Sequence, residues 1–262
     1  MSAFPSRASQ PDASPSSAFT LPDDWRDCAL FLDFDGTLVD LAPSPEAVVV
    51  ALGLTQLLAA VAAQLDGRLA IVSGRPVAQI DAMLAPLTLA AAGVHGAERR
   101  DANGVWHYAS APSLDPALLH LRPLVASHDG LLLEEKRGAL ALHYRLAPAL
   151  EAACMQAMRA AQAACPGTVL LHGKMVLELK PAGIDKGAVL AAFLQEPPFK
   201  GHRPLFFGDD TTDEAAIIYA QQVGGIGVKV GAGASAAHHR VAEPQALHAL
   251  LAQAAILQGD LS

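Results

Sequence analysis

The sequence is poor in cysteine and in positive charge. Its three cysteines, Cys28, Cys154 and Cys165, are odd in number, and no two have the Cys-x-x-Cys spacing of a zinc knuckle. A disulfide framework is therefore not expected, and a reducing, cytoplasmic location fits best. Lysine and arginine total 18 against 26 aspartates and glutamates, a net charge of −8. We expect no nucleic-acid partner, because such proteins present a basic field.

Long apolar runs and internal repeats are also missing from the sequence. No apolar run reaches the roughly 18 residues of a membrane span, so we expect no membrane insertion. The first 20 residues are rich in Ser, Pro and Ala and contain no apolar segment, which predicts a disordered tail over residues 1–22 rather than a signal peptide. What remains is a chain with 52% apolar residues, long enough for one large domain or two smaller ones.

Short apolar segments alternate with helical ones in both outer parts of the chain. The pattern predicts strands over 29–32, 69–72, 89–94, 204–208 and 224–230, and helices over 46–65, 77–84, 186–193 and 243–258. Such alternation is typical of a parallel α/β sheet, whose ligands bind at the carboxyl ends of the strands. Polar residues follow three of these strands in pairs: Asp33 and Asp35, Ser73 and Arg75, His95 and Glu98.

The middle of the chain has a different pattern. It predicts helices over 115–127 and 148–164, each followed by a hairpin, the first over 131–145 and the second over 168–180. This is an α+β arrangement. We therefore predict an α/β protein with a Rossmann-like parallel-sheet core, formed by residues 23–112 and 183–262, and an inserted α+β cap domain over 113–182.

The segment Asp33-Phe34-Asp35-Gly36-Thr37 has the residues needed for phosphoryl transfer. Side chains at positions i and i+2 of a strand point the same way, so Asp33 and Asp35 start on one side of the strand end. Two carboxylates this close repel each other unless a cation lies between them. With that charge neutralised, Asp33 could attack phosphorus as a nucleophile while Asp35 acts as general acid and then base. An ordinary acidic turn is the alternative.

Later polar residues would complete such a site. Asp209 offers another carboxylate for Mg²⁺, a hard cation that binds carboxylates, phosphate oxygens and waters. Asp210 and Asp213 could hold the outer shell of the metal. Ser73 could hold a phosphoryl oxygen at a helix start, and Lys186 could place a positive charge on the same phosphate.

In this order the motifs resemble a known superfamily. The segments are Asp33-x-Asp35-Gly36-Thr37, Ser73-Gly74-Arg75, Lys186 and Gly208-Asp209-Asp210-x-x-Asp213, and they resemble the haloacid-dehalogenase-type phosphatases. Within that superfamily the chain is similar to the trehalose-6-phosphate phosphatases. The further similarity lies in Gly93-Val94-His95-Gly96-Ala97-Glu98, Glu134-x-Lys136, His143-Tyr144-Arg145 and Glu178-x-Lys180-Pro181.

The resemblance implies a Mg²⁺-dependent hydrolysis of trehalose 6-phosphate, a small sugar phosphate, and we expect a monomer. It assigns Asp33 and Asp35 as nucleophile and acid/base, and it gives metal binding to Asp33, the backbone carbonyl of Asp35, and Asp209. It also implies that three cap residues grip the sugar hydroxyls: Glu134, Lys136 and Glu178. Gly74 and Arg75 are expected to contact the substrate.

The alternation of side chains supports the cap prediction separately. Glu134 and Lys136 share one face of their strand, as do Glu178 and Lys180, so one face of the cap sheet would carry acids and bases. The residues Met175, Leu177 and Leu179 would pack on the cap helices. The alternative is a solvated face with cross-strand ion pairs.

Several interpretations stay open. The substrate could be another sugar phosphate, such as sucrose 6-phosphate or mannosyl-3-phosphoglycerate, and a mutase or a non-catalytic sugar-phosphate sensor could use the same fold. Arg75 could contact phosphate or pair with a core acid, and His95 is interpreted as a structural or hinge residue. We interpret Glu98, Arg99 and Arg100 as a charged turn, and His238, His239 and His248 as surface residues.

Overall fold

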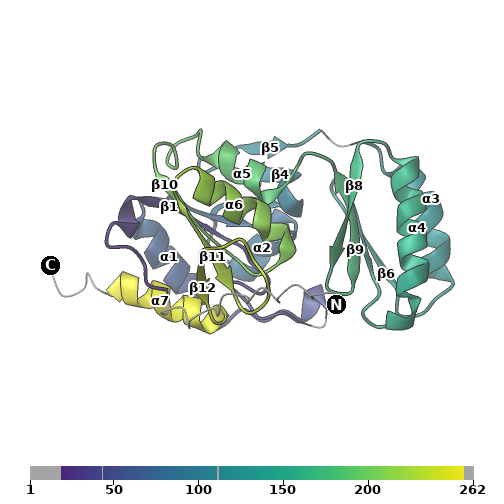
Figure 1. The fold of residues 1–262 in the computed structure, drawn as a ribbon, viewed down its shortest axis with the longest axis horizontal. Helices are drawn as coiled ribbons and strands as arrows, with labels where there is room; N and C mark the ends of the chain where they lie inside the picture. The colour runs from purple at the N-terminus through teal and green to yellow at the C-terminus, as the bar shows by residue number, and fades with distance from the viewer. Residues whose placement is uncertain (1–18, 43, 111, 257–262) are drawn as a thin grey trace, which may run out of the picture.

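The structure is a computed structural model that describes residues 19–42, 44–110 and 112–256. Most of the predicted tail over 1–22 lies outside these residues. The described chain forms an eight-stranded sheet and a separate four-stranded sheet. Figure 1 shows the two sheets side by side, with the larger one on the left. No helix of the described residues is long and apolar enough to cross a membrane.

The larger sheet has the strand order β12-β11-β10-β1-β2-β3-β4-β5. Six strands run parallel, and β4 and β5 are added antiparallel at one edge. The strands are β1 (Cys28–Leu32), β2 (Leu69–Val72), β3 (Ala90–Gly93), β4 (Glu98–Arg100), β5 (Trp106–Tyr108), β10 (Arg203–Gly208), β11 (Ile226–Val230) and β12 (His239–Val241).

Helices cover both faces of this sheet. One face packs against α1 (Leu54–Gln64), α2 (Val77–Leu84) and α7 (Pro244–Ile256), and the other against α5 (Lys186–Phe193) and α6 (Glu214–Gln222). Alternate residues of each central strand therefore enter different apolar clusters. Parallel strands that are covered on both faces have continuous apolar sequences, which explains why β1 is buried along its whole length.

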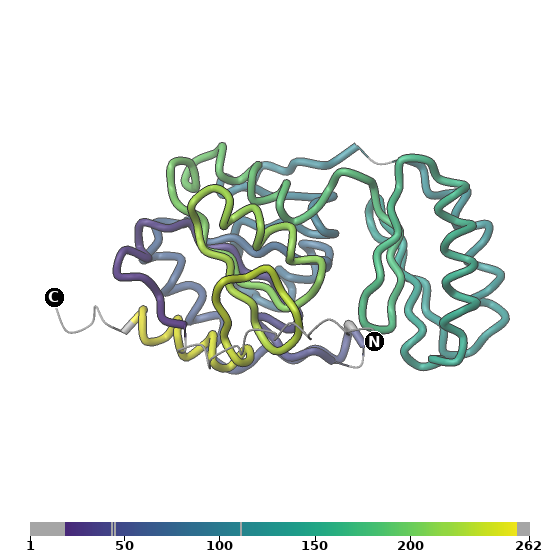
Figure 2. Tube along the Cα trace, viewed as in Figure 1, coloured from purple at the N-terminus to yellow at the C-terminus, as the bar shows by residue number. Residues whose placement is uncertain are grey.

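The smaller sheet is antiparallel, with the order β6-β7-β9-β8. Its strands are β6 (Leu132–Lys136), β7 (Ala139–His143), β8 (Thr168–Gly173) and β9 (Val176–Pro181). The helices α3 (Asp115–Ala126) and α4 (Glu151–Ala164) pack on its outer face, and its other face is turned toward the larger sheet (Figures 1 and 2).

The predicted fold class is confirmed by this arrangement: a Rossmann-like parallel core with an α+β unit inserted in it. The limits of the inserted domain at 113 and 182 stay a prediction. All three cysteines are buried free thiols, so the predicted lack of disulfides agrees with the structure.

The helix predicted over 46–65 is wrong in its first half. The structure has only a short 3₁₀ turn, Pro45–Ala47, before α1 begins at Leu54. Gly53 precedes α1 with a φ of +86°, a left-handed conformation that breaks a continuous helix. The β-branched run at 48–50 also lowers helix propensity. For the last helix, residues 257 and 258 lie outside the described residues.

The charged turn predicted at 98–100 is also wrong, because these residues form strand β4 and are buried. Arg99 donates to both oxygens of Glu196 at 2.7 and 2.9 Å. Arg100 makes the same forked contact with Asp81 at 2.6 and 2.7 Å. Partners that lie far away in the sequence thus allow a charged segment to be an inner strand.

Smaller differences concern three predicted positions. Met175 does not pack on the cap helices: it sits in the β8–β9 turn with a φ of +64° and is exposed. His239 belongs to β12, although it is exposed as predicted. His248 is half-buried, and its Nε2 lies 2.8 Å from the carbonyl oxygen of Leu38.

Candidate active site

Asp33 lies directly after β1, at the carboxyl end of the central strands, and is 4% exposed. Lys186, the first residue of α5, places Nζ 2.7 Å from Asp33 Oδ1 and 2.5 Å from Asp213 Oδ1. Burial, followed by the charge of Asp213, raises the pKa of Asp33 well above its usual range. Burial alone would lower the pKa of Lys186, but the two carboxylates hold it above its usual value. The ammonium group therefore carries its charge between two acids.

Asp213 organises the loop that follows β10. Its Oδ2 accepts hydrogen bonds from the backbone N–H groups of Asp209 and Asp210, at 3.0 and 2.9 Å. Asp210 in turn caps the next 3₁₀ turn by accepting from the N–H of Thr211 at 2.7 Å. Both oxygens of Asp213 are thus engaged by the protein itself. Asp213 therefore fixes where Asp209 and Lys186 lie.

Asp33, Asp209 and Asp213 bring carboxylate oxygens within 4.8 Å of one another. Burial, then the charges of Asp213 and Asp210, raise the pKa of Asp209 to about 6. Three acids and one ammonium leave an excess of negative charge at a site with oxygen donors only. That donor set fits a hard divalent cation such as Mg²⁺.

Close packing at this strand end requires glycine at position 36. Gly36 has a φ of +81°, and a Cβ there would lie 2.3 Å from the carboxyl carbon of Asp209. Any side chain would therefore push the two acidic segments apart. The Asp-x-Asp-Gly sequence is thus explained by geometry as well as by chemistry.

A second group of possible metal ligands in the described chain consists of Asp101, His107 and Glu196. Both carboxylate oxygens of Glu196 already accept from Arg99, at 2.7 and 2.9 Å. We assign no metal to this group.

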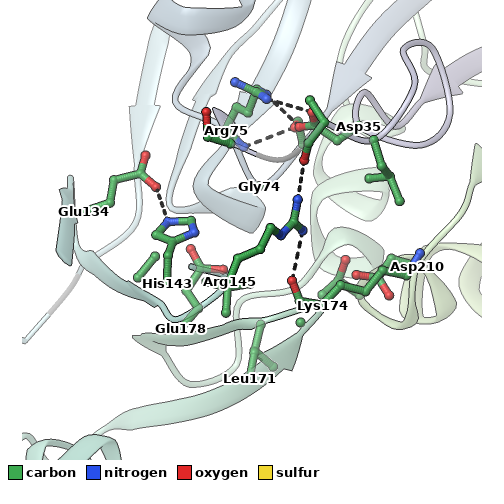
Figure 3. Close-up of a pocket in the computed structure, with 18 of the residues that line it drawn as sticks. Asp35, Gly74, Arg75, Glu134, His143, Arg145, Leu171, Lys174, Glu178 and Asp210 are labelled. Atoms are coloured by element: carbon green, nitrogen blue, oxygen red, sulfur yellow. Dashed lines mark hydrogen bonds and ion pairs between the residues drawn. The ribbon is translucent and has the colours of Figure 1, made fainter. Parts of the chain in front are cut away.

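Asp35, the second acid of the motif, is held by Arg75. The guanidinium donates through Nε and a terminal nitrogen to the two oxygens of Asp35, at 2.6 and 2.8 Å (Figure 3). The backbone N–H of Arg75 donates to the buried Ser73 hydroxyl at 3.1 Å. Of the two interpretations of Arg75, the pairing with a core acid is present in this structure, and a contact with phosphate stays a prediction.

The cap residues predicted to grip a sugar are brought together on the inner face of the smaller sheet. Lys136 Nζ lies 3.0 Å from Glu178 Oε1 and 3.7 Å from Glu134 Oε2. His143 Nε2 lies 3.1 Å from Glu134 Oε2 (Figure 3). Cross-strand ion pairs are present, as the alternative interpretation requires, but the face is covered by the core instead of solvent.

Glu178 is the most constrained of these residues. Besides Lys136, it contacts His95 of the core, whose Nε2 lies 2.6 Å from its Oε2. Burial alone would raise the pKa of Glu178, but His95 and then Lys136 outweigh it and hold the pKa far below its usual range. Lys180, on the same strand, turns away and donates to the carbonyl of Ile184.

Between the two sheets lies a cavity of about 460 Å³. All the predicted site residues except Asp213 line it, from Asp33, Asp35 and Lys186 on the core to Glu134, Lys136 and Glu178 on the cap. The cavity is wide enough for a ligand larger than a phosphate group. The carboxylate of Asp33 lies on the core side of the cavity, and the hydrogen-bonding side chains of Glu134, Lys136 and Glu178 lie on the cap side.

Two further lining residues, Arg145 and Lys174, were not among the predicted site residues, although His143-Tyr144-Arg145 is one of the segments that carry the resemblance. Arg145 donates to the carbonyls of Ala42 and Lys174, the latter at 3.1 Å (Figure 3). Lys174, in the turn between β8 and β9, places Nζ 3.8 Å from Asp209 Oδ2. Apolar side chains also line the cavity: Leu41, Leu132, Leu146, Leu171 and Val176. The sequence signal for Lys174 was its place at a hairpin tip, which alone does not indicate where the hairpin points.

Comparison with known proteins agrees with this geometry. A family model described as trehalose-phosphatase matches residues 31–248. The trehalose-6-phosphate phosphatase of Escherichia coli K12 is 43% identical over 216 residues, which cover 82% of this chain and 81% of that protein. A probable trehalose-phosphate phosphatase of Sinorhizobium fredii is 41% identical, with coverage of 90% and 89%.

Solved structures give the same result for the fold. A trehalose-6-phosphate phosphatase related protein superposes with a TM-score of 0.72 at 27% identity, covering 89% of this chain and 99% of that one. The C-terminal domain of the Candida albicans trehalose-6-phosphate phosphatase gives a TM-score of 0.75 at 23% identity, with coverage of 88% and 93%. At that identity the second likeness concerns the fold alone.

Proposed function

The chain belongs to the trehalose-phosphatase family, and we propose that it hydrolyses trehalose 6-phosphate to trehalose and phosphate through an aspartyl-phosphate. One observation carries the proposal: the buried Asp33 carboxylate, paired with Lys186, faces a cavity whose opposite wall holds the cap acids. We call the side of the cavity with Asp33, Asp35 and Lys186 the core wall, and the side with Glu134, Lys136 and Glu178 the cap wall. Residues of the core wall would carry out the reaction, and residues of the cap wall would select the sugar.

Asp33 is the proposed nucleophile. Lys186 holds its Oδ1, and we assign the other oxygen to the attack on phosphorus. A bond then forms between Asp33 and phosphorus as the bond from phosphorus to the sugar oxygen breaks. Water next attacks the acyl phosphate and releases inorganic phosphate, which returns Asp33 to its carboxylate form.

Asp35 is the proposed acid and base. It donates a proton to the departing sugar oxygen and later takes one from the attacking water. Arg75 now binds both oxygens of Asp35, and each oxygen keeps a second lone pair that can carry the proton for the sugar oxygen. We propose that phosphoryl oxygens take over part of the Arg75 fork, since guanidinium binds phosphate in a bidentate manner. Ser73 and Gly74 line the same part of the cavity.

Asp33, Asp209 and the backbone carbonyl of Asp35 are the proposed holders of Mg²⁺. When bound, the metal would supply positive charge against the phosphoryl oxygens and the crowded carboxylates. Asp210 and Asp213 remain proposed outer-shell residues. The contacts of Asp213 with Lys186 and two backbone N–H groups favour a role in holding Asp209 in place.

Glu134, Lys136 and Glu178 are the proposed sugar-binding residues. Two carboxylates accept hydrogen bonds and one ammonium donates them, which suits a ligand rich in hydroxyl groups. The leucines around them offer apolar surface to the faces of sugar rings. The monomeric state and the cytoplasmic location stay predictions.

The test is phosphate release in the presence of Mg²⁺ from trehalose 6-phosphate, sucrose 6-phosphate, glucose 6-phosphate and mannosyl-3-phosphoglycerate, with Asp33→Asn in parallel. We expect trehalose 6-phosphate to have the highest kcat/KM. The variant should lose activity at least about a thousandfold. Its melting temperature should not fall, because burial already disfavours the charge of Asp33.

Two results would overturn parts of this proposal. A preference for another sugar phosphate would keep the chemistry and reject the assigned substrate. Turnover by Asp33→Asn near that of the parent would reject Asp33 as the nucleophile.

A further inference from the structure

The contact between His95 and Glu178 joins the two halves of the molecule. His95 follows strand β3 of the core, whereas Glu178 lies in β9 of the cap sheet, and His95 Nε2 lies 2.6 Å from Glu178 Oε2. Both side chains are 10% exposed. We propose that His95 is a positioning residue, on which Glu178 docks so that this carboxylate faces the sugar in a fixed orientation. The inference rests on the proposed function.

The backbone around His95 supports a role for its side chain. Val94 and His95 have φ values of +50° and +52°, in the left-handed region that non-glycine residues rarely adopt. For a β-branched residue such as Val94 this conformation is unfavourable. The N–H of His95 donates to the carbonyl of Ser73 at 3.0 Å, which ties this loop to the turn that holds Arg75. The local conformation therefore directs the imidazole toward the cap.

The imidazole fills a narrow slot. A Cβ at Gly74 would lie 2.7 Å from both Cε1 and Nε2 of His95, so only glycine leaves room for the ring. Nδ1 of His95 is buried and has no hydrogen-bond partner among the described residues. The ring is thus held for the contact of its other nitrogen, Nε2, with Glu178. A tautomer with hydrogen on Nε2 lets the ring donate to the carboxylate.

Lys136 completes the arrangement from the cap side. Its Nζ lies 3.0 Å from Glu178 Oε1 and donates to the carbonyl of Gly74 at 3.1 Å. One oxygen of Glu178 is therefore bound by the core and the other by a cap residue that itself contacts the core. Since each carboxylate oxygen has two lone pairs, a sugar hydroxyl can still donate to Glu178 in this position.

A specific phenotype follows from this geometry. Without the His95 contact, Glu178 keeps only Lys136 and can rotate, so a sugar phosphate loses a fixed acceptor. A small aryl phosphate would contact the core wall alone and would not depend on Glu178. A change in the core loop would then alter how the cap recognises substrate.

Two variants of His95 test the proposal, and they differ in which property of histidine they keep. In His95→Gln the side-chain amide nitrogen reaches about as far as Nε2, but glutamine tolerates a left-handed backbone poorly. In His95→Asn the amide nitrogen reaches only as far as Nδ1, but asparagine tolerates that backbone well. Comparing the two variants therefore distinguishes an effect of the lost contact with Glu178 from an effect of the left-handed backbone at position 95.

We expect His95→Asn to lower kcat/KM for trehalose 6-phosphate by about tenfold or more, because a buried carboxylate loses a partner. His95→Gln should stay within about threefold of the parent, and para-nitrophenyl phosphate turnover should change less than about threefold in both. If the kcat/KM of His95→Asn for trehalose 6-phosphate equals or exceeds that of His95→Gln, His95 has only a structural role. The same conclusion follows if kcat/KM falls equally for trehalose 6-phosphate and para-nitrophenyl phosphate. Melting temperatures of both variants show whether either has lost its fold.

A double-mutant cycle with Glu178→Gln gives a second measurement. If His95 acts through Glu178, adding His95→Asn to Glu178→Gln should change kcat/KM for the sugar phosphate by less than about twofold. If instead the fold-loss of kcat/KM in the double variant equals the product of the two single-variant losses, the two residues act independently and the proposal is rejected. If the parent protein prefers another sugar phosphate, the proposed function fails, and the same comparisons on that substrate still decide the role of His95.

Discussion

The two walls of the cavity hold their charges in different ways. On the core wall, the acids follow buried strands and are held by groups of the core: Asp213 by two backbone N–H groups, Asp33 by Lys186 and Asp35 by Arg75. On the cap wall, Glu134, Lys136 and Glu178 project from the face of a sheet and are held mainly by side chains. The acids of the core wall are thus held mainly within the core, whereas the cap wall depends in addition on contacts of Glu178 and Lys136 with the core.

This difference between the two walls predicts how strongly a substitution of each charged residue affects the protein. A charge that is buried and unpaired destabilises a protein strongly, whereas an exposed pair contributes little. We therefore expect substitutions to lose effect in a definite order, from Lys186 on the core wall to the outer face of the cap.

The largest effect on stability is expected for Lys186→Met, which leaves Asp33 and Asp213 without their shared cation. Breaking such a buried pair destabilises by about 3–5 kcal/mol. Chemical denaturation of the metal-free protein measures it. Lys174→Met, which removes a 61% exposed ammonium group near Asp209, is the matched control and should cost less than about 1 kcal/mol.

Adding Asp33→Asn to Lys186→Met should restore part of the lost stability, because one of the two uncompensated acids is then neutral. If the double variant is less stable than Lys186→Met alone, the electrostatic explanation of this wall is wrong.

A smaller loss of stability is expected for Glu178→Gln, about 2 kcal/mol at pH 7, since two buried partners lose a charged acceptor. The folded-state pKa of Glu178 lies below its unfolded value of about 4.3. The ionised carboxylate therefore contributes stability above about pH 4.3, and this contribution is lost as the pH falls through the folded-state pKa. Unfolding free energies of parent and variant from pH 7 to 3 should converge below about pH 4. A gap that widens there would contradict the assignment.

Glu134→Gln should affect recognition more than stability. Its partners, His143 and Lys136, lie at 3.1 and 3.7 Å, and its side chain is 22% exposed, against 10% for Glu178. We expect kcat/KM for trehalose 6-phosphate to fall about fivefold to tenfold, the effect of one hydrogen bond to a charged group, with para-nitrophenyl phosphate unchanged. Equal losses on the two substrates would show that Glu134 does not bind the sugar.

The smallest effect is expected for Glu135→Gln, one residue further along β6. Glu135 pairs with Arg122 of α3 at 2.8 Å, and both side chains are about half exposed or more. Stability should change by less than about 0.5 kcal/mol and kcat/KM for either substrate should not change. If Glu135→Gln lowers kcat/KM for trehalose 6-phosphate as much as Glu134→Gln does, the inner face of the cap sheet, with Glu134, is not distinct from the face toward α3, with Glu135.

The fold could be predicted where local patterns carry the information. Continuous apolar strands, alternating hairpins and the glycine after Asp35 have short-range causes, and the elements at β1, β2 and the cap hairpins agree with the structure. The strand β4 could not be predicted, because its buried arginines depend on Glu196 and Asp81, which are distant in the sequence. Helix α6 (Glu214–Gln222) was not among the predicted elements either.

The same limit applies to the site. Spacing was enough to expect Asp33, Asp35 and Asp209 at one edge of the sheet, because parallel strands end together. It was not enough to choose between phosphate and a core acid as the partner of Arg75, or to find that His95 reaches Glu178 across 83 positions of the chain. Contacts between the core and the cap depend on how two distinct sheets face each other, which no local pattern encodes.

The burial of all three native thiols makes this chain a convenient background for fluorescent labelling. Cys28, Cys154 and Cys165 are at most 2% exposed, so maleimide dyes should react slowly with the folded protein. A cysteine introduced at the exposed Ser127 of the cap and another at the exposed Gln222 of the core could then carry a donor and an acceptor dye. Energy transfer between them would report the distance between the two sheets in solution, with and without substrate.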